Sequence, residues 1–418
     1  MNADIQSRPV ILLLGNYRPS LTLARTLRKQ GYRIVVGSHG CERECQHSNA
    51  VSQMWDHSPL GLTADRFANE LRRFCAETPP LAAIFPVAEE YVRLFAENQH
   101  VFKGLPPIAS VAPHLVRKCL DKPFMMRLAT GNGVPTAAFA TSSNGSELKL
   151  AIERAGFPMI IRPADSTKQL NGRKALTVES AEALSRISKE FKLESRDLLL
   201  QRKFEGKRHN VYFAAIGGKM LRCLHAVIDR TDNPDGSGLA VEGRTLPAEG
   251  PLVEQTSRLL AALDYTGIGC AQFLVNEKTG ASSFLEINSR IAGNHALPEF
   301  SGLGLGTFML DLALDNPVDR KPVFAPAGIR YAWMTGDLVG AKSAYLRGQI
   351  SAAAALLSCA RAIICALKAD VHMVYDKADP KPALHTLWQT LPRVARWRQP
   401  SLARGRSTIY GENTGVGK

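Results

Sequence analysis

The N-terminal part of the chain alternates short apolar runs with helical patterns. Val10–Leu14 is a continuous apolar run that ends at Gly15, which is typical of a strand buried on both faces. Apolar positions then recur at helical spacing until Gly31, and Tyr32–Val36 is predicted to be the next strand. We therefore expect a βαβ unit here, with Ala82–Val87 as a later strand of the same sheet.

The turn after the first strand, residues 15–20, lacks the G-x-G-x-x-G pattern of a dinucleotide site, so no NAD site is predicted there. A helix is expected from about Glu89 to Asn98. The front domain is expected to end near Ser110.

The stretch Tyr265–Gly306 carries the densest chemical pattern in the chain. Its strand-like runs Cys270–Val275 and Ser283–Ile287 flank a turn-rich insert, which predicts a β-hairpin. Residues directly opposite each other in such a ladder are neighbours, so we expect Gln272 and Glu286 to lie close together.

Oxygen-bearing side chains gather at the end of this hairpin. Glu286 shares a strand face with Asn288 if the strand persists, and Gln272 adds a third oxygen donor. Such donors suit Mg²⁺ beside phosphates, and the planar donor fork of Arg290 suits a phosphoryl oxygen. A plainer alternative is a polar turn in which Glu286 and Arg290 form a surface ion pair.

Two upstream segments carry related chemistry. Leu115–Gly133 is predicted to be a helix that contains Asp121 and Lys122, although an isolated Asp-Lys pair is usually an exposed helix surface. Gly156–Pro163 is predicted to be a strand that carries the cation Arg162 near its end, and a fixed guanidinium suits a phosphate chain.

These segments together resemble the ATP-grasp superfamily. The run FLEINSRIAG is similar to the family's C-terminal Glu-x-Asn-x-Arg motif, and GFPMIIRP is similar to its phosphate-contacting strand, with Arg162 as in the carbamoyl-phosphate-synthetase branch. The resemblance implies ATP with Mg²⁺, or Mn²⁺ in its place. It implies the following roles: Gln272, Glu286 and Asn288 as metal ligands, Lys122 and Arg162 as phosphate contacts, and Arg290 as the group that steadies the transferring phosphoryl.

The chain departs from the family pattern in the lid. Family members usually have a glycine-rich lid, whereas Ala164–Ala175 contains only Gly172 as a glycine. The hydroxyls of Ser166 and Thr167 with Lys168 could replace the missing backbone donors, and the segment also carries Arg173 and Lys174. A weak lid with altered activity is the alternative.

The hinge, Leu198–Gly206, also matches the family only in part. The resemblance implies adenine recognition by backbone groups at Lys203 and Phe204, with Gln201 serving the adenine amine. Arginines stand where the family often has acids, so ATP specificity is less secure than the phosphate and metal chemistry.

The activity that the resemblance implies is ligation. A carboxylate attacks the γ-phosphate of ATP, and an amine captures the acyl phosphate. His295 is a candidate general base, with a structural histidine as the alternative, and the polar loop Asp229–Gly243 is expected to cover the acceptor. Two rivals remain, a non-catalytic nucleotide-binding protein and a membrane-surface scaffold. The sequence names neither substrate.

Composition narrows the class of protein. The 418 residues are 45% hydrophobic and 22% charged, as in soluble globular proteins, and the eight cysteines show no pairing pattern. No signal peptide or membrane span is visible, so we expect a cytoplasmic protein. Ser351–Leu367 comes nearest to a span and is expected to be a buried or amphipathic helix. The net charge of +14 favours anionic partners. The basic residues are not interleaved with aromatic ones as in proteins that bind single-stranded nucleic acid, so no nucleic-acid partner is expected.

Two further patterns leave alternatives open. His39, Cys41, Cys45 and His47 could hold Zn²⁺, but their spacing is not a common structural-zinc spacing, and a loop explains them equally well. The segment His385–Arg398 interleaves tryptophans with arginines, which suits peripheral contact with an anionic membrane at the inner face. A basic helix docked on its own domain is the alternative.

The expected fold class is α/β. A Rossmann-like N-terminal domain (1–110) is followed by a two-lobed ATP-grasp α+β domain (111–323), a C-terminal extension (324–400) and a basic tail (401–418). The expected partners are a small carboxylate and a small amine. The sequence does not decide between a monomer and a homodimer.

Overall fold

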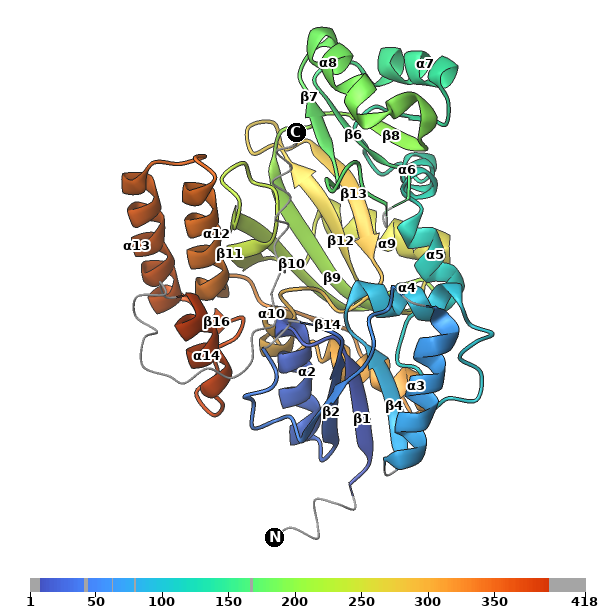
Figure 1. The fold of residues 1–418 in the computed structure, drawn as a ribbon, viewed down its shortest axis with the longest axis vertical. Helices are drawn as coiled ribbons and strands as arrows, with labels where there is room; N and C mark the ends of the chain where they lie inside the picture. Colours follow the sequence, from blue (N-terminus) through green and yellow to red (C-terminus); the bar gives the residue numbers. More distant parts are fainter. Residues whose placement is uncertain (1–7, 41–43, 62, 79, 166–167, 391–418) are drawn as a thin grey trace, which may run out of the picture.

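The computed structural model describes residues 8–40, 44–61, 63–78, 80–165 and 168–390. Within them the chain is a mixed α/β protein built on three sheets, with a large sheet between two smaller ones (Figure 1).

The first sheet is parallel and contains the predicted βαβ unit. Alternate residues of its central strand enter different cores: Ile11 and Leu13 pack with α2, and Leu12 and Leu14 pack with α3 and α4. This two-sided burial explains the unbroken apolar run. The strand order is β3 (Gln53–Asp56), β2 (Arg33–Ser38), β1 (Val10–Leu14) and β4 (Leu81–Pro86), with helices α2 (Arg18–Lys29), α3 (Ala64–Glu77) and α4 (Glu89–Glu97).

The small antiparallel sheet forms the lobe at the top of Figure 1 and has a core of its own. Leu148 and Leu184 from its helices pack with Ile161 and Leu200 from its strands. The order is β5 (Phe139–Ser142), β8 (Leu198–Arg202), β6 (Met159–Pro163) and β7 (Leu176–Val178), with α7 (Gly145–Ala155), α8 (Ala181–Phe191) and the 3₁₀ turn η1 (Leu193–Ser195).

The large sheet runs through the middle of the molecule. Its order is β13 (Ser282–Asn288), β12 (Gly267–Val275), β9 (Lys207–Ile216), β10 (Lys219–Thr231), β11 (Ala240–Leu246), β15 (Arg330–Ala332) and β16 (Val371–His372), and β14 (Val323–Phe324) pairs with β10. Its neighbouring helices are α5 (Pro113–Leu120), α6 (Lys122–Gly131), α9 (Pro251–Leu263), α10 (Ala296–Phe300) and α11 (Leu305–Ala313).

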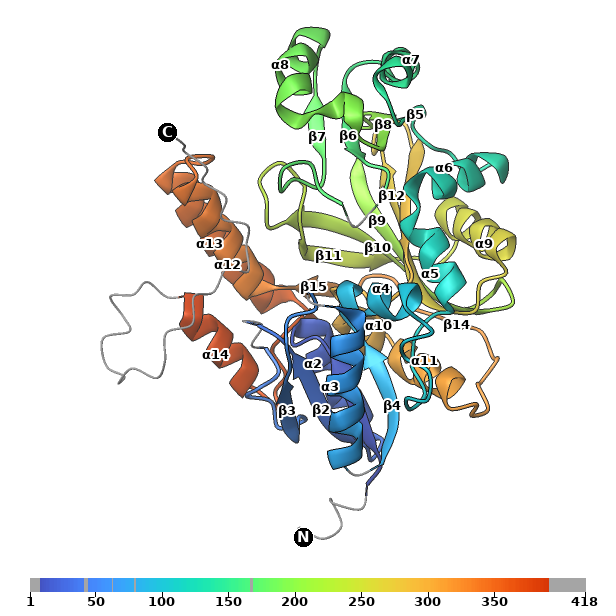
Figure 2. The same cartoon turned by 45° about the vertical axis from the view of Figure 1, so that its right-hand side comes forward.

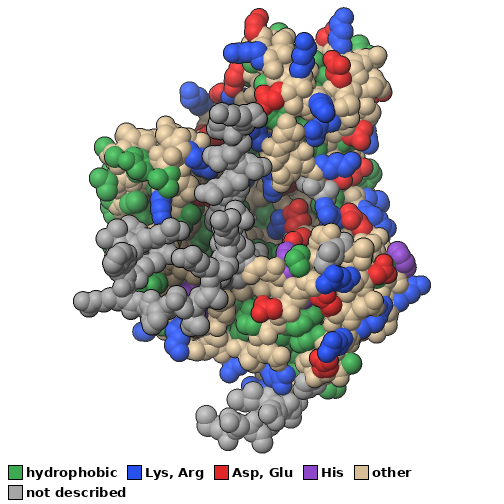
Figure 3. Space-filling view, viewed as in Figure 1, with side chains coloured by type: hydrophobic (Ala, Val, Ile, Leu, Met, Phe, Trp, Pro, Cys, Tyr) green, Lys and Arg blue, Asp and Glu red, His purple; other side chains and the backbone are tan. Residues whose placement is uncertain are grey.

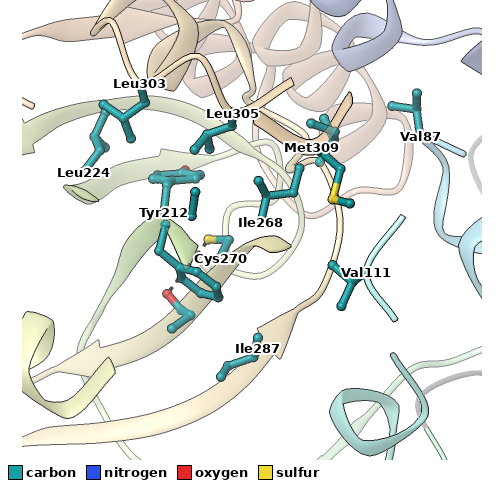
Figure 4. Close-up of a cluster of buried hydrophobic side chains, with 14 of the residues drawn as sticks. Val87, Val111, Tyr212, Leu224, Ile268, Cys270, Ile287, Leu303, Leu305 and Met309 are labelled. Atoms are coloured by element: carbon teal, nitrogen blue, oxygen red, sulfur yellow. Dashed lines mark hydrogen bonds between the residues drawn. The ribbon is translucent and has the colours of Figure 1, made fainter. Parts of the chain in front are cut away.

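The first sheet and the large sheet share one hydrophobic core. In Figure 4, Met309 of α11 lies between Val87, which follows β4 of the first sheet, and Ile268 of β12 of the large sheet. Burial of these side chains, each worth about 1.5–3 kcal/mol, holds the two sheets together.

The structure corrects two expected elements. The single helix predicted over Leu115–Gly133 is two helices, because Asp121 caps α6 by accepting a hydrogen bond from the Phe124 N–H. The polar loop predicted over Asp229–Gly243 is shorter, because β10 and β11 extend into it and leave residues 232–239 between them.

The C-terminal part of the chain adds strands to the large sheet and a helical pair beside it (Figure 2). The pair is α12 (Met334–Leu346) and α13 (Ala352–Lys368), and α14 (Lys381–Thr390) follows. No described helix has the length and hydropathy needed to cross a bilayer.

Candidate active site

The β12–β13 hairpin forms as predicted. Asn276 makes its turn by accepting hydrogen bonds from the N–H groups of Lys278 and Thr279. The register places Gln272 directly opposite Glu286. The strand also persists to Asn288, so Glu286 and Asn288 lie on one face, and Asn288 Nδ2 donates to Glu286 Oε1 at 3.1 Å.

Arg290 follows this strand and reaches the first sheet rather than Glu286. Its Nε and Nη2 donate to Glu89 Oε2 at 3.0 and 2.6 Å, and Nη1 donates to the Ile291 carbonyl. Nη2 also lies 3.4 Å from Asn288 Oδ1. Among the described residues its ion pair is therefore with Glu89, and the surface pair with Glu286 that the plainer alternative required is not formed.

Lys122 and Arg162 come together through a short bridge between Asp121 and Asp165. Burial, and after it the charge of Arg162, lower the pKa of Lys122 to about 8, although the charges of Glu286, Glu89 and Asp165 oppose the change. Burial likewise lowers the pKa of Arg162, and Glu286 opposes this. Lys122 and Arg162 are close enough to lower the pKa of Lys122 by repulsion, and an anion bound between them would relieve this repulsion.

Lys122 and Glu286 line a cavity of about 170 Å³ between α4, α5, α6 and β13, whereas Arg162 is not among its described lining residues. Its polar lining comes from several elements: Glu89, Arg93, Lys122, Lys174, Glu286, Asn288, Ser289 and Arg290. The volume suits a phosphate-sized group with its ion better than a whole nucleotide.

The chain is similar to known proteins in sequence and in fold. Residues 247–321, which include the hairpin, match the family described as carbamoyl-phosphate synthase L chain, ATP binding domain. The solved structure of a biotin carboxylase from Campylobacter jejuni, described as a β-γ-ATP complex, has a TM-score of 0.59 and 16% identity over 76% of this chain and 73% of its own. An L-amino acid ligase from Bacillus licheniformis has a TM-score of 0.57 and 14% identity over 76% of this chain and 78% of its own.

The chain has the ATP-grasp fold.

A curated relative of this chain is D-alanine–D-alanine ligase A from Bradyrhizobium diazoefficiens. It is 24% identical over 229 residues, which span 48% of this chain and 61% of the relative.

Several residues that the ATP-grasp resemblance implied as nucleotide contacts do not line the cavity. Lys168 is exposed, and Gln201 is buried in β8 with its Nε2 3.1 Å from Met126 Sδ. Lys203 Nζ pairs with Glu179 at 2.8 Å, and its backbone N–H donates to the Pro158 carbonyl, so neither donor is free for adenine. Phe204 is half-buried, and Ser166 lies outside the described residues.

Two metal-site predictions also have a mixed outcome. Glu286 and Asn288 line the cavity, whereas Gln272 lies across the ladder and is not among the described lining residues. The four-ligand zinc pattern is not assembled by the residues that the structure describes: His39 contacts Glu90, Cys45 is buried, and His47 lies against His385. Cys41 lies outside the described residues.

His295 does not reach the cavity. It lies at the start of α10 with 1% of its side chain exposed, and its Nε2 is 3.2 Å from Glu299 Oε1. Glu299 in turn accepts a hydrogen bond from Thr26 of α2. This geometry corresponds to the structural alternative, because a general base must reach the proton that it removes.

The sequence reasoning missed Glu89 and did not single out Lys174. Glu89 follows β4, at the carboxyl end of a parallel strand. Ligands of α/β proteins bind at these ends, so the position of Glu89 after a predicted strand could have identified it as a candidate. Lys174 comes from the atypical lid, and its proximity to the hairpin is a tertiary contact with no local pattern.

A second polar group lies on the large sheet near the loop 232–239. Arg208 of β9 donates to the Gly238 carbonyl in that loop. Arg208 Nε and Asn210 Oδ1 are buried with no hydrogen-bond partner among the described residues, and Asn294 lies within hydrogen-bond reach of the Tyr331 hydroxyl. Burial raises the pKa of Tyr331, which keeps its hydroxyl protonated, and the nearby charge of Arg208 opposes this shift. Unsatisfied buried groups of this kind cost free energy unless a ligand or water meets them.

Proposed function

We propose that this ATP-grasp protein is an ATP-dependent ligase that activates a carboxylate as an acyl phosphate and joins it to an amine, with Mg²⁺. The observation that carries the proposal is the convergence of Lys122, Lys174 and Arg290 with Glu286 and Asn288 on one cavity. The similar proteins whose names describe ligases or carboxylases support it.

The residues present fit both the metal and the phosphates. Glu286 and Asn288 offer carboxylate and amide oxygens on one strand face, which are the donors that Mg²⁺ prefers. Arg162 Nε is buried with no hydrogen-bond partner among the described residues, and it lies near enough to Lys122 to lower its pKa. An anionic phosphate chain would satisfy both.

The chain's own residues would mainly hold and orient the reactants. Lys122, Arg162 and Lys174 would bind the phosphates of ATP, and Glu286 with Asn288 would hold the metal. Bound Mg²⁺ would neutralise charge on the phosphoryl oxygens. Arg290, fixed by Glu89, would stabilise the charge that develops on the transferring phosphoryl group.

No protein nucleophile is needed for this reaction. A carboxylate oxygen of the substrate attacks the γ-phosphorus, and the bond to the β-phosphate oxygen breaks to release ADP. The amine then attacks the acyl carbon, inorganic phosphate leaves, and the amine proton passes to solvent. Positioning and charge neutralisation therefore carry the catalysis.

The second polar group would bind the carboxylate substrate, which accepts the phosphoryl group. Arg208, Asn294 and Tyr331 offer donors, and Asn210 offers an acceptor, close to the loop 232–239. A small polar molecule bearing a carboxylate would satisfy them. Under this proposal the loop covers the acceptor, as expected from the sequence.

The domain layout belongs to the same proposal. The parallel sheet would be the Rossmann-like domain, and the small and large sheets would be the two lobes that enclose the nucleotide. At the hinge between them, a side chain at Gly206 would collide with the Val275 carbonyl at 2.5 Å, so glycine is required for the close approach. The C-terminal helices would form the extension.

Two measurements test the function. MgATP should raise the melting temperature, because a ligand that binds only the folded state at 100 times its Kd adds about 2.7 kcal/mol. ADP release should then appear with a carboxylate and an amine from a panel of small acids and amino acids. A shift without any turnover would favour the non-catalytic nucleotide-binding rival, and no shift at millimolar MgATP would reject both.

A further inference from the structure

The outer face of α13 is an apolar stripe that nothing in the described structure covers. Leu356, Leu357 and Leu367 are 72%, 73% and 82% exposed, and Ile363 and Ile364 are about half exposed at 49% and 50%. Figure 3 shows these hydrophobic side chains gathered over the helical pair at the left. Residues spaced by three, four and seven lie on one side of a helix, so the stripe extends over about three turns.

The helix that carries this stripe, α13, is packed against the rest of the protein. Ala362, on the opposite side of α13, is 1% exposed, and Arg361 lies 3.4 Å from Glu242 of β11. Glu242 also binds Arg230 of β10 at 2.6 Å, and Arg230 binds Asp337 of α12. A charged network therefore holds the pair on the large sheet and presents the leucines outward.

The charges along the helical pair are mainly basic, and the flanking acids Asp337 and Asp370 are paired with Arg230 and Arg330. The run from Leu338 to Ala369 contains Lys342, Arg347, Arg361 and Lys368 but no Asp or Glu. The residues after Thr390 add six Lys or Arg against Glu412 alone. A second copy of the stripe, or the chain's own C-terminal segment, would bring cations against cations, whereas an anionic surface has the opposite charge.

We propose that the α12–α13 pair docks on an anionic lipid surface, with α13 lying in the plane of the headgroups. The stripe from Leu356 to Leu367 would run about 17 Å along the surface, at about 1.5 Å per residue. Leucine and isoleucine would enter the boundary between headgroups and acyl chains, and Lys342, Arg347 and Lys368 would meet the lipid phosphates. Leu384 and Trp388 of α14, which packs beside α12, are also exposed at 60% and 47%.

Vesicle flotation of the full chain tests the proposal. Vesicles of phosphatidylcholine and phosphatidylglycerol at about 7:3 should carry the protein upward at low salt. Binding should fall at least about tenfold on pure phosphatidylcholine, or when salt at about 0.5 M screens the charges.

The variant Leu356→Ser/Leu357→Ser/Ile363→Ser/Ile364→Ser should lose at least about tenfold in vesicle affinity, because it removes most of the apolar area that the lipid would bury. The matched control Leu150→Ser/Phe324→Ser changes residues that are 55% and 56% exposed elsewhere and should bind as the wild type does. The single variant Leu357→Asp gives the same test with a smaller change if the fourfold variant melts early.

Four results would overturn the proposal: no binding of the wild type to anionic vesicles, equal loss in the control, retained binding by Leu357→Asp, or a wild-type dimer that the stripe variant converts to a monomer. Loss of binding on deletion of residues 391–418, with the stripe variant unaffected, would assign the contact to the tail instead. The MgATP melting shift should be the same in all variants, so this proposal and the ligase proposal fail separately.

Discussion

Arg290 donates two hydrogen bonds to a single oxygen of Glu89, Oε2, at 3.0 and 2.6 Å, across 201 residues of sequence. The contact joins the end of β13 to the start of α4. It sets the direction of the guanidinium toward the cavity, because the first sheet holds Glu89 in place.

Glu89→Gln is expected to lower turnover about tenfold while leaving MgATP affinity nearly unchanged. The neutral amide cannot attract both donors of the Arg290 guanidinium, so its positioning is lost. The Glu89 side chain is 42% exposed, so the free energy of unfolding should change by no more than about 1 kcal/mol. The control is Glu90→Gln, which only removes the contact with His39. Equal turnover in the two variants would contradict a positioning role for Glu89.

Glu286→Gln is expected to reduce turnover about a thousandfold, which corresponds to about 4 kcal/mol of lost barrier lowering. Glutamine keeps the size of the side chain but removes the charge that would hold the divalent metal. ADP release measures the effect, and circular dichroism checks the fold. Glu277→Gln, on the turn of the same hairpin, removes only an exposed ion pair with Lys207 and should be near normal. Near-normal turnover of Glu286→Gln would mean that the active site lies elsewhere.

The affinity for MgATP should depend on pH through Lys122. Its folded-state pKa is lowered to about 8, so the charge that attracts phosphate is present at pH 7 and is lost as the pH rises through about 8. Affinity should therefore fall between pH 7 and 9, by at most about tenfold per pH unit above 8. Lys122→Arg, which stays charged, should show a flat profile in calorimetric titrations. The same slope in both proteins would exclude Lys122 as its source.

Asp379→Asn is expected to cost about 1.5–3 kcal/mol of stability at pH 7. Burial alone would raise the pKa of Asp379, but hydrogen bonds from Ser48, Asn49 and Arg25 hold it below its ordinary value. A carboxylate whose pKa is lowered in the folded state stabilises the fold. This stabilisation is complete at pH values above the unfolded-state pKa, near 3.9, and is lost as the pH falls through the folded-state pKa.

Urea unfolding should therefore show the difference between wild type and Asp379→Asn shrinking from pH 6 toward pH 3. Asp65→Asn, on the exposed start of α3, is the control and should cost little at either pH. A difference that stays constant with pH would mean that the carboxylate charge of Asp379 is not what stabilises the fold.

Local patterns predicted the hairpin well. The register of Gln272 and Glu286 follows from alternation and turn composition, which are properties of a few neighbouring residues. Similarly, Lys122 reaches the cavity as the motif implied. The helix break at Asp121 was missed, although a capping residue followed by Pro123 is a local signal for it.

Long-range packing explains what the sequence could not predict. Glu89 and Lys174 reach the cavity from elements far from the hairpin, and His295 has a helical partner in Glu299 that removes it from the site. For α13 the run Ser351–Leu367 predicted a buried or amphipathic helix, but a local pattern shows only that one side of a helix is apolar. It does not show whether anything covers that side.

Asp379 binds Ser48 across 331 residues and Arg25 across 354. During synthesis the N-terminal sheet emerges first, at about 5–20 residues per second, so Asp379 follows Ser48 by about 17–66 s. Over that interval Arg25 has to wait without its carboxylate, and the edge of the large sheet that β15 and β16 will occupy has to wait for its last strands. The nascent chain therefore spends this time with an incomplete sheet edge, which is when a holding chaperone would matter most.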